Sequence, residues 1–262
     1  LEKGANAIHF EPRSGKVVIR FRTEREIETQ GDISEGWFLV LCNRLKSNIE
    51  MVDSKEVFVE GFLPHKFEGR KFVFYTSIVN TKHGNAVTLL NLTPRNFPES
   101  FDDLPIDENL REDILNIIGG RSGMVIVVGT EKTEKLGFIQ LLLSKKHAEM
   151  KNTFSIGSMP WFSDSSYMQI KVRVEDRMEL LEGMKVALSQ DPDIMYVEDM
   201  WDRRVMQFAL QSAINNLFIV STLHFPDTLT ALEYSNESIE NKTLLTKAMR
   251  GLVGVHVYRT LC

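Results

Sequence analysis

Residues 124–128 form a continuous apolar run, M-V-I-V-V, which is followed by a loop opening on Gly129 and then by a helical segment at 134–150. Such a run is typical of a strand covered on both faces, as in parallel sheets. The alternation continues, with strands predicted at 153–156, 194–197 and 217–222 and helices predicted at 176–189 and 203–213. This order predicts an α/β fold with a parallel sheet, whose ligands lie at the carboxyl ends of the strands.

The N-terminal third has a different pattern, with mixed helix and strand. Segments 17–22 and 71–79 are rich in β-branched and aromatic residues and are predicted strands. A third strand is predicted at 86–92, and the turn signal K-H-G-N before it indicates a hairpin. Apolar residues at helical spacing predict a helix at 37–48.

A proline-rich stretch separates the two patterns. Residues 92–105 contain Pro94, Pro98 and Pro105, and proline disfavours helix in the residue before it. We therefore predict an N-terminal domain at 1–93, an extended linker at 94–106 and a C-terminal domain at 107–262.

Charge and cysteine content exclude several classes of protein. With 31 basic and 36 acidic residues the net charge is −5, which disfavours binding to nucleic acid. The apolar runs are far shorter than the ~20 residues that a membrane-spanning helix needs. Cys42 and Cys262 cannot form a disulfide framework or a metal cluster by themselves, which favours a reducing compartment such as the cytosol. The chain does not begin with Met, so we interpret it as a piece of a longer protein.

The loop after the first parallel strand has the layout of a phosphate-binding P-loop. That motif reads G-x-x-x-x-G-K-S/T, and residues 129–136 read G-T-E-K-T-E-K-L. Gly129 and Lys135 are in register, and the candidate phosphate-binding residues are Gly129, Lys132, Thr133 and Lys135. Taken alone, a match of this kind occurs by chance in many proteins.

Further segments carry a resemblance across nearly the whole chain. They are A-N-A-I-H-F-E-P at 5–12 with V-I-R-F-R at 18–22, L-S-Q-D-P-D-I at 188–194, S-T-L-H at 221–224, and G-L-V-G-V at 251–255 with R-T-L-C at 259–262. In order and spacing they resemble motifs of the type II secretion and type IV pilus assembly ATPases.

The resemblance implies a PAS-like α+β N-terminal domain followed by a RecA-like P-loop ATPase domain. It also implies hexameric rings at the cytoplasmic face of an inner membrane, where ATP hydrolysis drives pseudopilus or pilus extension. The implied partners are secretion or pilus assembly proteins, including an active paralogous ATPase and an inner-membrane platform. No integral membrane segment is expected.

Two residues align with catalytic positions of that family. The family's V-G-E-I-R-D aligns with V-E-D-M-W-D at 197–202, so Asp199 replaces the catalytic Glu and Glu198 replaces a Gly. His224 lies in the histidine motif, where the resemblance implies a γ-phosphate sensor. The alternatives are that both acids are solvated at a strand end and that His224 only caps or packs there.

Departures from the family pattern concentrate on phosphate chemistry. Glu134 replaces a cradle glycine and sets a negative charge against a polyanion, and Leu136 replaces the hydroxyl that binds Mg²⁺. The family's acidic motif T-I-E-D-P-V-E-Y aligns with S-I-G-S-M-P-W-F at 155–162, where no carboxylate remains. Tyr75 and Leu90 occupy positions of phosphate-directed arginines. Cys262 matches the first cysteine of a zinc module, but no partner cysteines follow, so no metal is expected.

Two hypotheses follow, and a third needs the motif matches to be coincidence. The first is a non-catalytic relative of the motor ATPases, without a nucleotide cofactor, that acts as a structural or regulatory subunit in a homo- or hetero-hexamer. Its basis is the simultaneous loss of four independent contributors to hydrolysis, namely the cradle glycines, the metal-binding hydroxyl, the acidic motif and the N-terminal arginines. The second is an active but atypical ATPase that binds ATP and Mg²⁺ and uses Lys132, Lys135, Asp199 and His224. The third is an unrelated α/β enzyme with a deep apolar pocket.

Overall fold

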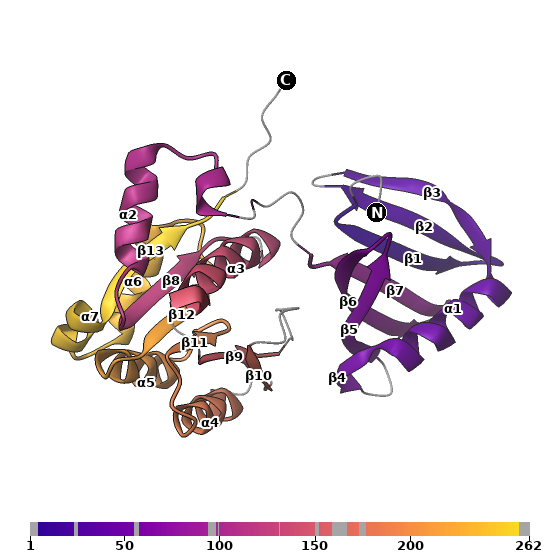
Figure 1. Ribbon diagram of the computed structural model, residues 1–262. Helices are drawn as coiled ribbons and strands as arrows, with labels where there is room; N and C mark the ends of the chain where they lie inside the picture. Colours follow the sequence, from indigo (N-terminus) through magenta and orange to yellow (C-terminus); the bar gives the residue numbers. More distant parts are fainter. Residues whose placement is uncertain are drawn as a thin grey trace. The chain divides into compact units, whose positions relative to one another are not determined.

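The computed structural model describes residues 5–23, 26–54, 58–93, 98, 100–130, 132–149, 152–158, 167–172 and 177–256. The chain divides into two compact units, Leu1–Thr93 and Pro94–Cys262. Figure 1 shows a sheet in each unit, and the units are described separately below.

The N-terminal unit is an antiparallel sheet with a helix packed on one face. The sheet order is β3-β2-β1-β7-β6-β5-β4. Its described elements are β1 (Ala7–Arg13), β2 (Lys16–Thr23), β3 (Glu26–Ser34), α1 (Glu35–Asn48), β4 (Glu50–Ser54), β5 (Phe58–Phe67), β6 (Arg70–Thr81) and β7 (Gly84–Asn91). The predicted strands at 17–22, 71–79 and 86–92 are confirmed as β2, β6 and β7, and the predicted hairpin joins β6 to β7.

Helix α1 begins earlier than predicted because Ser34 caps it. The Ser34 side chain accepts a hydrogen bond from the amide of Trp37, which satisfies one of the unpaired donors of the first turn. Phe38 of α1 stacks on Phe10 of β1 with ring centroids 5.7 Å apart. Cys42 is also buried in this core and is a free thiol.

The C-terminal unit is built on a parallel sheet in the order β10-β9-β11-β12-β8-β13. Its described elements are a 3-10 turn (Phe101–Asp103), α2 (Glu108–Ile118), β8 (Gly123–Val128), α3 (Lys132–Glu149), β9 (Thr153–Gly157), β10 (Met168–Lys171), α4 (Arg177–Leu188), β11 (Ile194–Val197), α5 (Arg203–Ile214), β12 (Phe218–Leu223), α6 (Thr228–Ser238), α7 (Lys242–Ala248) and β13 (Met249–Gly254). The predicted parallel strands and their intervening helices are confirmed.

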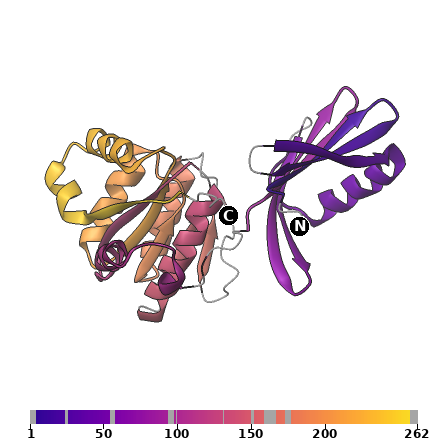
Figure 2. The ribbon, with the colours of Figure 1, turned by 90° about the horizontal axis from the view of Figure 1, so that it is seen from above.

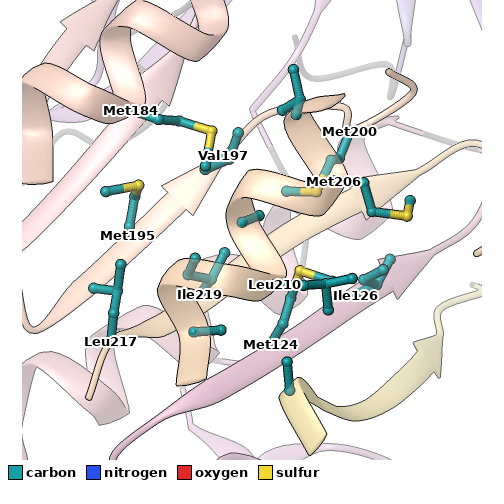
Figure 3. Packing of buried hydrophobic residues seen from close by; sticks show 14 of the residues in the cluster. Met124, Ile126, Met184, Met195, Val197, Met200, Met206, Leu210, Leu217 and Ile219 are labelled. Carbon is teal, nitrogen blue, oxygen red and sulfur yellow. The ribbon is translucent and has the colours of Figure 1, made fainter. Parts of the chain in front are cut away.

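Helices cover both faces of this parallel sheet. Helices α4 to α7 pack on one face, and α2 and α3 lie on the other (Figures 1 and 2). Methionines contribute much of the packing between the sheet and α4 and α5, where Met184, Met195 and Met206 lie among aliphatic side chains (Figure 3). Every residue of β8 is buried, as its continuous apolar run predicted.

Part of the predicted linker is folded rather than extended, so that expectation is wrong at residues 101–103. Phe101 is buried and makes an edge-on contact with Phe138 of α3, with ring centroids 5.8 Å apart. The Arg111 guanidinium donates to the carbonyls of Phe101, Asp102 and Leu104. These contacts bind the turn to the C-terminal unit.

None of the helices in the described ranges is both long enough and apolar enough to span a bilayer.

Two neighbouring residues of α1 allow a matched test of its packing. Replacing the buried Phe38 by Ala should lower the free energy of unfolding by about 3–5 kcal/mol, because it removes a large ring from the core. Trp37 is 75% exposed, and Trp37→Ala should change that free energy by less than about 0.5 kcal/mol. Urea unfolding followed by far-UV circular dichroism measures both, and equal losses would contradict this packing of α1.

Candidate functional site

The candidate site lies where four neighbouring parallel strands end. Val197 of β11 pairs with Ile156 of β9 on one side and with Ser221 of β12 on the other. Leu223 of β12 pairs with Val128 of β8. The loops that follow these strands therefore start at the same edge of the sheet. This edge is where parallel α/β sheets bind ligands.

Gly129 and Lys135, two of the predicted phosphate-binding residues, are brought together at this edge. The Gly129 amide and the Lys135 ammonium both donate to the Leu223 carbonyl, each at 3.3 Å. A Cβ atom added to Gly129 would lie 2.6 Å from the Val255 carbonyl oxygen and 3.3 Å from Cγ of Lys135. Glycine is therefore required here by close packing.

The first turn of α3 differs from a phosphate cradle. Lys135 is 1% exposed, so its ammonium lies inside the protein, where it donates to the Leu223 carbonyl. Leu136 is 2% exposed and adds apolar surface at the position where the motif has a hydroxyl. The side chains of the predicted residues Lys132 and Thr133 lie outside the described part of the structure.

Asp199 and His224 form a polar pair that links the ends of β11 and β12. Nε2 of His224 lies 3.1 Å from Oδ2 of Asp199 and donates to it, since an ionised carboxylate only accepts. Thr222 holds the acid from the other side. Its hydroxyl donates to Oδ1 of Asp199 at 2.6 Å and accepts from the Asp199 amide at 3.0 Å.

The backbone of Asp199 is in the left-handed region, with φ of 42°. Residues other than glycine adopt this conformation rarely, although Asp and Asn tolerate it best. Here the Thr222 hydroxyl bonds both the amide and the carboxylate of Asp199, so the surrounding contacts hold this backbone in place. Strained backbone of this kind concentrates at functional sites.

Glu198 is buried, and the expectation that both strand-end acids are solvated is wrong. Its side chain is 1% exposed, and its Oε2 accepts from the amide of Ser158 at 2.7 Å and from the Ser158 hydroxyl at 2.9 Å. A Cβ atom added to Gly157 would lie 2.5 Å from the same Oε2. The carboxylate therefore occupies the space that a side chain on Gly157 would take.

A carboxylate thus lies at the end of β9, where none was expected. The sequence predicts no carboxylate in the segment 155–162, where Gly157 and Ser158 replace the acids of the family's motif. Glu198 supplies one from the neighbouring strand, because residue 198 follows Val197, which pairs with Ile156. Sequence comparison missed it because strand register is needed to see that the two positions meet.

The carboxylates at this edge contribute to a shifted pKa of Tyr196 in β11. Burial, and then the nearby carboxylates of Glu198 and Asp199, raise the pKa of the Tyr196 phenol well above its usual value. Tyr196 therefore remains neutral at physiological pH.

Tyr75 and Leu90 occupy the positions of the family's arginines. They are paired across β6 and β7 in the N-terminal sheet, and the Tyr75 hydroxyl donates to Glu60 at 2.7 Å. Within the residues that the structure describes, no three His, Cys, Asp or Glu side chains are arranged to hold a metal ion. Cys262 lies outside those residues.

Comparison with known proteins identifies the family of this chain. A family model described as "Type II/IV secretion system protein" matches residues 1–262. The chain belongs to this family. The resemblance carried by its sequence motifs is thereby confirmed.

Family members of known role are secretion and pilus proteins. The chain is 24% identical to the type II secretion system protein E of Pectobacterium carotovorum subsp. carotovorum and 22% identical to the type IV pilus assembly ATPase TfpB of Acinetobacter baylyi. Each match covers 100% of this chain but only 53% and 45% of the respective relative. The chain thus spans about half the length of these relatives.

Two solved structures share the fold of this chain. The pilus retraction motor PilT, solved with bound ADP, matches 97% of this chain and 74% of its own with a TM-score of 0.69 at 18% identity. The Legionella pneumophila ATPase DotB matches 92% of this chain and 68% of its own with a TM-score of 0.66 at 14% identity. The chain therefore shares the α/β fold of these two proteins, with an antiparallel-sheet unit followed by a parallel-sheet unit.

The contact between Gly157 and Glu198 is testable by a double-mutant cycle. Gly157→Ala should lower the free energy of unfolding by about 1–3 kcal/mol, because the new methyl group meets Oε2 of Glu198. Combining it with Glu198→Ala should give less than the sum of the single losses, with a coupling of at least about 0.5 kcal/mol. Urea unfolding of the four proteins provides the cycle.

Gly36 in α1 is the matched control, because a Cβ atom added there would meet nothing within 4 Å. Gly36→Ala should leave stability unchanged or raise it by about 0.4–1 kcal/mol. Strict additivity of the Gly157 and Glu198 changes would show that the two side chains do not compete for one space.

Proposed function

We propose that this chain is a non-catalytic relative of the type II secretion and type IV pilus motor ATPases and acts as a structural or regulatory subunit of a secretion or pilus machine. The observation that carries the proposal is the packing of the first turn of α3. There Leu136 fills the position of the Mg²⁺-binding hydroxyl with a buried apolar group, and the Lys135 ammonium is bound to the Leu223 carbonyl.

The electrostatics of that turn support the proposal. Glu134 stands where the motif has glycine, and a carboxylate about 4 Å from a phosphate charge is repelled by about 4 kcal/mol at a protein surface. Lys135 offers a compensating charge, but it would have to leave a buried carbonyl to reach a ligand. A hydrogen bond to a charged group contributes about 1.5–3 kcal/mol, and Lys135 would lose this contribution on leaving the carbonyl.

The alternative is an active but atypical ATPase that binds ATP and Mg²⁺. The observation that favours it is the ordered group of Asp199, Thr222 and His224 at the carboxyl edge of the sheet, with Lys135 near Leu223. Asp199 would then take the role of catalytic base, and His224 would contact the γ-phosphate, as the resemblance implies. Asp is one methylene shorter than the family's Glu, so water bound by it would shift by ~1 Å, enough to lower the rate about 100-fold.

The proposal includes the setting that the resemblance implies. The N-terminal unit is proposed as a PAS-like domain, supported by the packing of α1 on one face of its antiparallel sheet. The chain is proposed to act in the cytoplasm, at the inner membrane through its partners, within a homo- or hetero-hexamer. The partners are an active paralogous ATPase and a membrane platform protein.

Calorimetric titration with Mg-ATP tests the absence of nucleotide binding. Titration of the unmodified chain with Mg-ATP should give no heat signal that corresponds to a micromolar dissociation constant. A Glu134→Gly, Leu136→Thr double variant should bind at least about tenfold more tightly, a change of about 1.4 kcal/mol, because it restores a cradle glycine and a hydroxyl.

Leu136→Val in place of Leu136→Thr is the control for side-chain shape without the hydroxyl, and it should give a smaller gain. Micromolar binding by the unmodified chain that Lys135→Ala abolishes would overturn the proposal. Turnover lost on Asp199→Asn would establish the active alternative.

Assembly provides a second, independent test. Mixed with an active ATPase of the same family from its own secretion or pilus system, the chain should sediment in a larger species than it forms alone. Lys135→Ala should sediment in the same way, since assembly does not use the nucleotide site. Unchanged sedimentation of the mixture would argue against a subunit role beside an active motor.

A further inference from the structure

Three aromatic rings lie directly beyond the Asp199–His224 pair. Trp201 follows Asp199 by two residues, Phe225 follows His224 by one, and Tyr234 comes from α6. The ring centroids of Trp201 and Phe225 are 5.0 Å apart, those of Trp201 and Tyr234 are 5.6 Å apart, and those of Phe225 and Tyr234 are 5.3 Å apart. Each ring thus contacts the other two.

The cluster joins the two loops that carry the pair. Trp201 belongs to the loop after β11 and Phe225 to the loop after β12. The Tyr234 hydroxyl also donates to the Trp201 carbonyl, so it fixes the main chain of the first loop as well as its side chain. Offset and edge-on contacts of this kind favour particular ring orientations.

The Asp199–His224 contact is therefore held from two sides. On the strand side, Thr222 bonds both the amide and the carboxylate of Asp199, and its carbonyl accepts from the Met200 amide at 3.1 Å. On the loop side, the rings set the separation of the chain segments just beyond the pair. A change in that separation would move His224 away from Asp199.

Core packing alone does not account for the cluster. Trp201 is 42% exposed, whereas Met200 beside it is fully buried in the main core. The family motif quoted above has Arg where this chain has Trp201, so the resemblance does not supply this ring. Trp201 contacts Phe225, in the loop after β12, and Tyr234, in α6, and these contacts join its own loop to both elements.

We propose that Trp201, Phe225 and Tyr234 are positioning residues that set the contact between Asp199 and His224. The rings act through the two loops and do not touch a ligand. This assignment does not depend on whether the chain hydrolyses ATP, and it is tested without nucleotide.

The proton that His224 donates to Asp199 gives a direct measurement. In protein labelled with [15N]histidine, the Nε2–H resonance of His224 is assigned by its loss in His224→Gln. It should exchange slowly with solvent in the unmodified chain and rapidly in Asp199→Asn. Trp201→Ala and Tyr234→Ala should each speed its exchange several-fold, while Trp201→Phe, which keeps a ring, should have a smaller effect.

Two controls separate positioning from general loosening. The ring of His147 lies 2.9 Å from the Thr153 hydroxyl, and its signals should not change in any of these variants. Trp37→Ala removes an exposed ring of the N-terminal unit and should leave the His224 proton unaffected.

Tyr234→Phe removes only the hydroxyl and remains informative if the alanine variants fail to fold.

In Tyr234→Phe we expect faster exchange at His224 with an unchanged melting temperature. Exchange at His224 that is unchanged in both Trp201→Ala and Tyr234→Phe would overturn the proposal. Equal acceleration at His147 and His224 would overturn it too, because it would assign the rings to overall stability.

Discussion

The parallel register of β9, β11, β12 and β8 is the constraint on which the candidate site depends. It starts four loops at one edge of the sheet, so that Glu198 meets Ser158, and Asp199 meets Thr222 and His224, although these partners are far apart in sequence. Within this edge the Leu223 carbonyl is the common acceptor for the Gly129 amide and the Lys135 ammonium. The loop after β8 and the start of α3 are thereby tied to the end of β12.

Charged groups at this edge bind to the protein itself. Glu198 accepts from Ser158, Asp199 accepts from Thr222 and His224, and Lys135 donates to Leu223. Burying a charge is costly unless it is hydrogen-bonded, and these contacts offset that cost without a ligand. An anion entering here would have to compete with the Leu223 carbonyl for the Lys135 ammonium, which adds to the argument for a non-catalytic role.

The sequence predicted the elements with strong periodicity and missed those set by tertiary contacts. The apolar run of β8 and the helices α3 to α5 were recognisable, whereas β10 is a four-residue edge strand with three exposed residues and carries little pattern. The turn at Phe101 depends on Phe138 and Arg111, which are distant in sequence. At the site, motifs located Lys135, Asp199 and His224, but the burial of Glu198 follows from strand register, and motifs do not contain it.

That register also changes how the departures from the family pattern should be counted. Taken along the sequence, the loss of an acid at Gly157 and the gain of one at Glu198 are separate events. In the structure they are one event, because a side chain on Gly157 and the Glu198 carboxylate would occupy the same space. An acid therefore remains at the end of β9, and its apparent loss does not argue against hydrolysis. The argument against hydrolysis rests instead on the start of α3, where Glu134 and Leu136 replace a glycine and a hydroxyl of the motif.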